Sequence, residues 1–267
     1  MKSTTRRAYA KDWAHFVAWC ADWDLPSLPS EPATVVAYLE VLGVGLPRCR
    51  QILSTITKMH THHSFETPCK NSEVFEFLAA IPRKKSSRKV IDSNLLFRLL
   101  TALPDTVAGK RDRLLLLLGF SGALRRSEIV ALTVEQVRVE PDGLVLLISE
   151  GDSIKIPRGE SPVVCSVEAY QAWVHAAQIK TGALFRTVHW SSKLGPVLGP
   201  AKDGGKIVDR ALKRALKSLG IDPAGYSAGS LRAGWGVEAA ARSGKVYAAA
   251  QGRWRAISSI YRHLEKL

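Results

Sequence analysis

Apolar side chains recur at helical spacing along the first eighty residues of the chain. This spacing predicts helices at 3–19, at 46–60 and near 71–80. Pro32 stands where a first-turn proline begins a further helix, which continues to about Leu42. The N-terminal part of the chain is therefore predicted to be all helical.

The pattern changes from Asp92 onward. The runs 143–148 and 153–157 have the composition of strands, and the Glu-Gly-Asp sequence at 150–152 between them is a turn signal. The other periodic segments predict helices at 92–103, 110–120, 127–132, 167–179, 208–219, 231–243 and 256–264. We therefore expect a mainly α fold with a small antiparallel β-sheet.

A cluster of like charge separates the two parts of the chain. The segment 83–89 carries five basic side chains and no acidic one. A solvated linker needs polar residues but not a single sign of charge, so contact with phosphate groups is the favoured interpretation. The sequence predicts a helical domain at 1–82, a basic linker at 83–91 and a second domain at 92–267. The five basic residues are Arg83, Lys84, Lys85, Arg88 and Lys89.

Composition indicates a folded chain with an excess of positive charge. Its 267 residues include 38 Lys and Arg against 24 Asp and Glu, so the formal net charge is +14. An apolar fraction of 46% excludes a disordered or fibrous chain. The apolar run 114–120 is too short to cross a bilayer, and the N-terminus lacks a signal-like apolar core. We expect a cytoplasmic protein whose charge attracts nucleic acid or an anionic membrane surface.

Cysteine and histidine spacing does not indicate a metal site. The four cysteines show no C-x-x-C pairing, which favours free thiols in a reducing compartment. His60, His62, His63 and Cys69 lie close together, but no second pair of ligands at metal spacing accompanies them. We therefore expect neither a metal nor a cofactor.

Three short segments carry a family resemblance. The segment 122–132, Gly-Ala-Leu-Arg-Arg-Ser-Glu-Ile-Val-Ala-Leu, resembles the first arginine box of the tyrosine recombinases, the phage-integrase family. The segment 227–234, Ser-Ala-Gly-Ser-Leu-Arg-Ala-Gly, resembles the second box, and the Gly-Arg-Trp at 252–254 resembles the segment before the nucleophile. The order and separation of the three segments resemble the family's catalytic domain. The helical first part resembles its core-binding domain.

The resemblance implies cleavage of a DNA strand through a 3′-phosphotyrosine, without metal or nucleotide. Arg125 and Arg232 would donate to the non-bridging oxygens of a phosphodiester, because their forked, permanently charged groups suit phosphate. Tyr261 would be the covalent nucleophile. Trp254 holds a position that is His or Trp in the family, and Glu128 would orient an arginine.

Three positions depart from the family pattern. Gly229 stands where the family usually has a histidine, and Glu150 stands nearest the place of its hairpin lysine. Lys155 is a weaker candidate for that missing proton donor. In the family the tyrosine usually stands at the place of His263, two residues after Tyr261. Because two residues rotate a helical side chain by roughly 200°, Tyr261 would face away from a site that His263 faces. A core aromatic residue is the competing interpretation of Tyr261.

Two functions stay open on this sequence. We favour a duplex-DNA-binding protein of recombinase fold with impaired catalysis, acting as an accessory factor, inert subunit or regulator, because DNA binding tolerates Gly229 and Glu150 whereas proton transfer does not. The alternative is an active recombinase that uses Tyr261. Attachment to RNA or to a membrane surface by charge alone would explain none of the three segments.

The expected partners follow from the favoured function. They are double-stranded DNA and a second copy or a paralogous recombinase, with no membrane, and the DNA-bound protein would lie on the nucleoid. Besides the linker, the residues expected to face DNA by resemblance are Arg48, Arg50 and Lys58.

Overall fold

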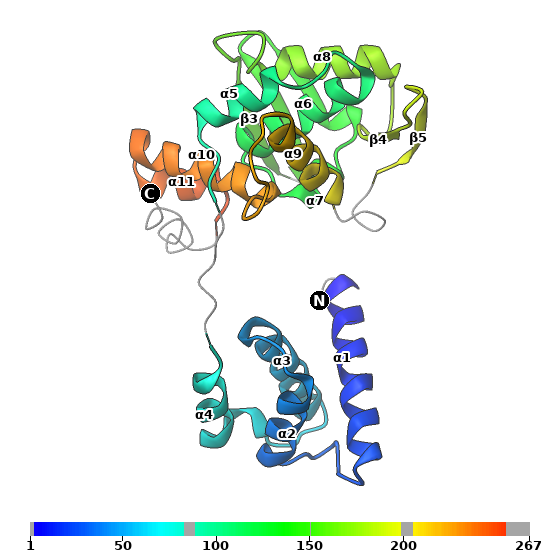
Figure 1. Ribbon diagram of the computed structural model, residues 1–267, viewed down its shortest axis with the longest axis vertical. Coiled ribbons are helices and arrows are strands. Elements are labelled where there is room, and N and C mark those ends of the chain that lie inside the picture. The colour runs from blue at the N-terminus through cyan, green and yellow to red at the C-terminus, as the bar shows by residue number, and fades with distance from the viewer. Residues whose placement is uncertain (1–2, 83–88, 150, 199–204, 255–267) are drawn as a thin grey trace. The chain divides into compact units, whose positions relative to one another are not determined.

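The computed structural model describes residues 3–82, 89–149, 151–198 and 205–254. The chain divides into two compact units after Ser86 (Figure 1). Each unit has a buried apolar core of its own. Most described residues are helical and the main sheet is small and antiparallel. The predicted fold class is therefore confirmed.

Unit 1 is all helical among its described residues. Helix α2 begins at Pro32, because the fixed φ of proline suits the first turn and its missing N–H has no partner there anyway. Helix α1 packs against α3, and α2 packs against α4. The core between them contains Phe16, Tyr38 and Ile56. The elements are α1 (Ser3–Asp22), α2 (Pro32–Leu42), α3 (Leu46–His62), the 3₁₀ turn η1 (Pro68–Lys70) and α4 (Ser72–Ala80).

His60, one of the side chains considered for a metal, has hydrogen-bond partners within unit 1. His60 is fully buried, where its Nδ1 lies 2.9 Å from the Ile56 carbonyl oxygen and its Nε2 accepts from the Ser30 backbone N–H at 3.0 Å. All four cysteines are free and buried. Within the described ranges, no three ligating side chains come together as a metal site.

Unit 2 is built around helix α6. The five leucines at 114–118 are buried on every side, because α8, α9 and α10 all pack against this helix. None of the helices described in either unit is long and apolar enough to cross a bilayer. The helices are α5 (Ser93–Thr101), α6 (Val107–Phe120), α7 (Arg126–Ile129), the 3₁₀ turn η2 (Val134–Gln136), α8 (Ser166–Ala177), α9 (Lys206–Ser218), α10 (Ala228–Ser243) and α11 (Lys245–Gln251).

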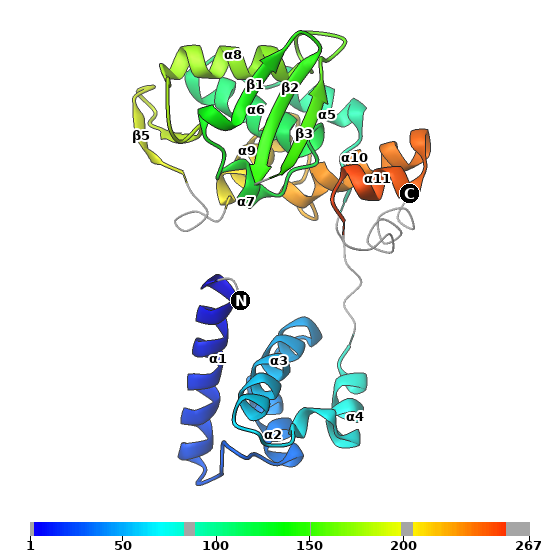
Figure 2. The same ribbon diagram turned by 180° about the vertical axis from the view of Figure 1, so that it is seen from behind.

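A three-stranded antiparallel sheet lies on one face of these helices (Figure 2). Its order is β1-β2-β3, and buried Leu146 of β2 pairs with buried Ile154 of β3. The alternating pattern predicted β2 and β3 but missed β1, which has four residues at the sheet edge. The strands are β1 (Val137–Glu140), β2 (Gly143–Ser149), β3 (Asp152–Pro157) and a separate hairpin of β4 (Arg186–Val188) and β5 (Leu194–Val197).

One helix prediction differs from the structure, one helix was not predicted, and one prediction is not tested. The helix expected at 127–132 is the single turn of α7, because Glu128 caps its start and Val130 already ends it. Helix α11 was not predicted, since its seven residues are too few for a clear period. The helix expected at 256–264 lies outside the described residues.

Candidate active site

Arg125 directly precedes helix α7 and is held there by Glu128. One carboxylate oxygen of Glu128 accepts the backbone N–H of Arg125 at 2.7 Å, and the other accepts its Nη1 at 2.7 Å. The first N–H groups at the start of a helix have no partner within the helix. The carboxylate of Glu128, three residues after Arg125, therefore stabilises this turn by accepting the Arg125 N–H. The Arg125 side chain is thereby fixed while half of it stays exposed.

Arg232 lies buried in helix α10, which packs against α6. Its Nη1 donates to the carbonyl of Ala123, and its Nη2 donates to the carbonyl of Gly252. Ala123 adopts a left-handed φ of 45° in the turn after α6, and this turn presents its carbonyl to the guanidinium. Burial, together with the nearby charge of Arg125, lowers the pKa of Arg232 to about 10. Arg232 therefore stays charged at neutral pH in a site that favours an anion.

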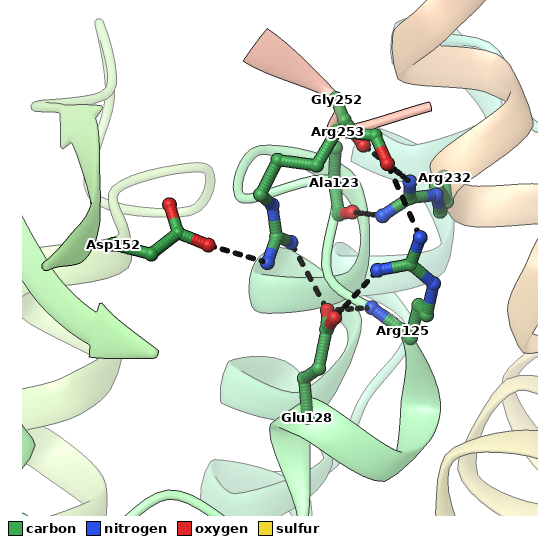
Figure 3. A network of polar contacts seen from close by, with 7 residues as sticks. All are labelled: Ala123, Arg125, Glu128, Asp152, Arg232, Gly252 and Arg253. Carbon is green, nitrogen blue, oxygen red and sulfur yellow. Dashed lines mark hydrogen bonds and ion pairs between the residues drawn. The ribbon is translucent and has the colours of Figure 1, made fainter. Parts of the chain in front are cut away.

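Arg253 joins the two arginine boxes, as Figure 3 shows. Its carbonyl oxygen accepts from Nη2 of Arg125 at 3.1 Å and from Nη2 of Arg232 at 3.4 Å. Its own Nη2 donates to Glu128 at 3.0 Å, and its Nη1 lies 4.0 Å from a carboxylate oxygen of Asp152 on β3. Sequence reasoning missed Arg253, whose one signal was its place directly before a candidate residue.

Glu128 is the carboxylate that balances this group of positive charges. Burial alone would raise the pKa of Glu128. Hydrogen bonds from the backbone and side chain of Arg125, and the charges of Arg253 and Arg125, outweigh burial and hold the pKa below its ordinary value. Glu128 is thus an anion that contacts two arginines, Arg125 and Arg253.

Trp254 packs directly against this site. Its ring lies 4.5 Å from the guanidinium carbon of Arg232, measured to the ring centroid, and stacks on Trp235 at a centroid distance of 6.2 Å. A Cβ added at Gly236 would lie 2.6 Å from the ring, and one at Gly252 would lie 1.8 Å from it. The two glycines therefore make room for the ring, and packing by Trp254 also places Arg232.

A pocket of about 430 Å³ opens beside the arginine pair. Gly229, in the first turn of α10, stands at its edge where the family usually has a histidine. A Cβ at Gly229 would meet only the Ser227 hydroxyl, at 3.5 Å, so this position is open space. Sequence reasoning also missed Arg126, which stands in the first arginine box but was given no role, and Asp209, which no motif marked. The pocket is lined by Leu124, Arg125, Arg126, Asp209, Ser227, Ala228, Gly229 and Arg232.

The structure does not bring Lys155 to the arginines. Lys155 lies on the exposed face of β3, where its Nζ contacts Asp142 at 2.7 Å and Glu140 at 3.5 Å. It lies three residues along the strand from Asp152, or about 10 Å. The candidates Tyr261 and His263 lie outside the described residues, as does Glu150, which stands nearest the place of the family's lysine.

The residues expected to face DNA from unit 1 differ in their surroundings. Arg50 and Lys58 are exposed on helix α3. Arg48 is also on α3, but it donates to both oxygens of the buried Asp12, at 2.8 and 2.6 Å. That pairing ties α3 to α1 and gives Arg48 a structural role.

Of the basic linker residues, only Lys89 is described. Its backbone N–H donates to the Gly225 carbonyl at 2.9 Å, and its Nζ lies 5.2 Å from the centroid of the Tyr226 ring. Lys89 is thus docked on the loop before α10. The other four, outside the described residues, are Arg83, Lys84, Lys85 and Arg88.

Comparison with known proteins adds to this geometry. No family model matches the chain. The chain is 30% identical over 254 residues to an integrase/recombinase xerD homolog of Selenomonas ruminantium. The aligned region covers 88% of this chain and 73% of that protein.

Two solved structures share its fold. One is a lambda integrase(75–356) dimer bound to a COC′ core site, with a TM-score of 0.63 and 13% identity over 98% of this chain and 89% of that one. The other is the XerH site-specific recombinase bound to a palindromic difH substrate, with a TM-score of 0.63 and 14% identity. The match covers 88% of this chain and 69% of that one.

The fold and the two arginine boxes define a recombinase catalytic domain, in which arginines from two distant segments meet beside one pocket. The similarity to the Selenomonas protein extends over most of both chains. The chain belongs to the tyrosine recombinase family.

Proposed function

We propose that this chain binds duplex DNA and acts in site-specific recombination or integration, with its strand-cleavage step impaired. The observation that carries the proposal is the pair Arg125 and Arg232, which line one pocket and donate to the same carbonyl oxygen of Arg253. Two guanidinium forks beside one pocket suit the non-bridging oxygens of a phosphodiester. The net charge of +14 supports a polyanionic partner.

Cleavage in this family's manner needs a proton as well as a phosphate site. The tyrosine hydroxyl would lose its proton as its oxygen bonds to phosphorus, the bond from phosphorus to the 5′ oxygen would break, and that oxygen would take up a proton and leave as a hydroxyl. Arg125 and Arg232 would stabilise the charge that builds up on the non-bridging oxygens. The remaining requirement is a group that donates the proton.

The impairment concerns this proton donor. Among the described residues that line the pocket there is no lysine and no histidine. Gly229 has no side chain to offer, and Lys155 is held by carboxylates on the outer face of the sheet. Arginine keeps its proton at neutral pH and is a poor donor to a leaving oxygen. Phosphate binding is thus supported by more of the site than proton transfer is.

An active recombinase that forms a phosphotyrosine through Tyr261 is the second candidate. The assembled group of Arg125, Arg232 and Trp254 favours it, because these groups meet as catalysis would need. The two candidates differ in one measurable event, which is the formation of a covalent protein–DNA adduct.

Unit 1 and the linker would add contacts to DNA. Arg50 and Lys58 are exposed on one helix of unit 1, and five basic side chains follow in the segment 83–89.

The proposed partner on DNA is a second copy or a paralogous recombinase, since the related lambda integrase structure holds a dimer on its core site. The proposed place of action is the cytoplasm, on the nucleoid.

The experiment compares two chemical forms of one duplex. Duplexes from the DNA that flanks the gene are first screened for binding by gel shift. Each bound duplex is then prepared as a nicked suicide substrate with either an ordinary linkage or a 5′-bridging phosphorothiolate at each candidate position. A thiol has a pKa near 8.5, so sulfur leaves without a proton donor. Covalent adducts are measured on a denaturing gel for wild type and Tyr261→Phe, with an active relative in parallel.

The outcomes separate the candidates. Binding without an adduct on the ordinary duplex supports the impaired protein, and an adduct on the phosphorothiolate alone places the defect in proton donation. An adduct on the ordinary duplex that is lost in Tyr261→Phe establishes the active recombinase. Absence of duplex binding at low salt would overturn the proposed function.

A further inference from the structure

Arg126 is a third arginine beside the pocket. It follows Arg125 in the chain and also lines the pocket that Arg125 and Arg232 share. Arg125 lies in extended backbone just before helix α7, and Arg126 is the first residue of that helix. Both side chains line the pocket, and 51% of the Arg126 side chain is exposed.

Asp209 holds the Arg126 guanidinium in place. One oxygen of Asp209 accepts from Nη1 of Arg126 at 2.8 Å, and the other accepts the backbone N–H of Ala228 at 2.7 Å. The carboxylate thus has a partner in the first turn of α10 as well as in α7. This contact leaves other N–H groups of the guanidinium to donate to a ligand, since an arginine carries five.

Helix α9 begins against the backbone of Arg126. A Cβ added at Gly205 would lie 2.6 Å from the Arg126 carbonyl oxygen, and Gly205 has a left-handed φ of 77°. A residue with a side chain would push the two segments apart. This close approach brings Asp209, one turn further along α9, to the arginine.

The charges at the pocket favour more than one phosphate. Three guanidiniums line it, and Asp209 is the carboxylate among the described lining residues. Gly229 also lines the pocket and has no side chain to fill it, and a Cβ there would meet only the Ser227 hydroxyl, at 3.5 Å. We propose that Arg126 binds a second backbone phosphate of the duplex, next to the phosphate held by Arg125 and Arg232. This inference rests on the proposed DNA binding.

The test measures how duplex affinity depends on salt. Each phosphate contact contributes about 0.9 to the slope of log K against log salt on duplex DNA. Arg126→Gln is expected to lower this slope by about 0.9, whereas Arg126→Lys, which keeps the charge, should retain it. Thermal unfolding of each variant confirms that it is folded.

Arg214→Gln is the matched control. Its side chain is 53% exposed and paired with Asp112, which keeps a second partner in Arg111. Arg214 does not line the pocket, so its loss should leave the slope unchanged. An equal fall in both glutamine variants would show an effect of net charge alone and would overturn the inference.

Single methylphosphonate linkages then locate the phosphate. In wild type, removing the charge at either of two adjacent positions should weaken binding. In Arg126→Gln, one of those two substitutions should lose its effect, as in a double-mutant cycle. If Arg126→Gln keeps the wild-type slope, or if both substitutions keep their full effect, the inference is wrong while DNA binding stands. A wild-type protein that does not bind the duplex overturns the proposed function itself.

Discussion

The guanidinium carbon of Arg232 lies 4.5 Å from the centroid of the Trp254 ring. A cation held against an aromatic face is stabilised by about 2 kcal/mol or more when both groups are shielded from water. Arg232 is buried, and the Trp254 ring also stacks on Trp235. The tryptophan is thus part of the support that keeps a buried charge beside the pocket.

Removal of the Trp254 ring should destabilise unit 2. Trp254→Ala is expected to lower the free energy of unfolding by about 3 kcal/mol, because a large packed ring is lost beside a buried charge. Trp254→Phe keeps an aromatic face and should cost about 1 kcal/mol. Urea unfolding followed by circular dichroism measures both. Equal losses would show that the ring does not support Arg232.

Two glycines of helix α10 should respond to alanine in opposite ways. Gly236→Ala places a methyl group 2.6 Å from the Trp254 ring and should cost about 1 to 3 kcal/mol through overpacking. Gly229→Ala meets only the Ser227 hydroxyl and should stabilise the helix by about 0.5 to 1 kcal/mol. Thermal unfolding of the pair checks this. Stabilisation by both substitutions would contradict the close packing of the ring.

Glu128 should give stability that depends on pH. Its pKa is lower in the folded protein than its ordinary value of 4.5, so the unfolded chain binds more protons as the pH falls. Its contribution is therefore fully present above pH 4.5 and is lost as the pH falls through the folded pKa. Glu128→Gln should cost about 1 to 3 kcal/mol at pH 7, and its difference from wild type should shrink below pH 4.5.

Denaturant unfolding of wild type and Glu128→Gln at pH 7, pH 5 and pH 3.5 measures this dependence. A difference between the two proteins that stays constant over this range would show that the Glu128 charge does not stabilise the fold.

Two arginines of helix α3 should separate stability from DNA binding. Arg48→Ala leaves the buried Asp12 without its main partner and should lower the free energy of unfolding by about 2 kcal/mol. Arg50→Ala removes an exposed side chain and should change stability by less than about 0.5 kcal/mol. Its proposed effect is a weaker affinity for duplex DNA. Unfolding and gel-shift titrations of both variants check the assignment, which fails if Arg50→Ala destabilises unit 1 as much as Arg48→Ala.

Local pattern in the sequence determined most of the helices and the central hairpin. The leucine run of α6, the proline at the start of α2 and the alternation in β2 and β3 each act within a few residues. Short elements such as β1, β4 and α11 have too few positions to show a period, so the sequence did not predict them. The arginine boxes were visible because Arg125 and Arg232 each stand in a motif.

Only the tertiary structure decided which groups meet across the fold. Periodicity shows which face of a helix is buried, but not which partner it meets, because that depends on the packing of distant segments. Such packing brings the Arg253 carbonyl to the two arginines that donate to it. It also brings Asp209 to Arg126, and Asp12 to Arg48. The sequence determined the residue types of the proposed phosphate site, and the fold decided their contacts.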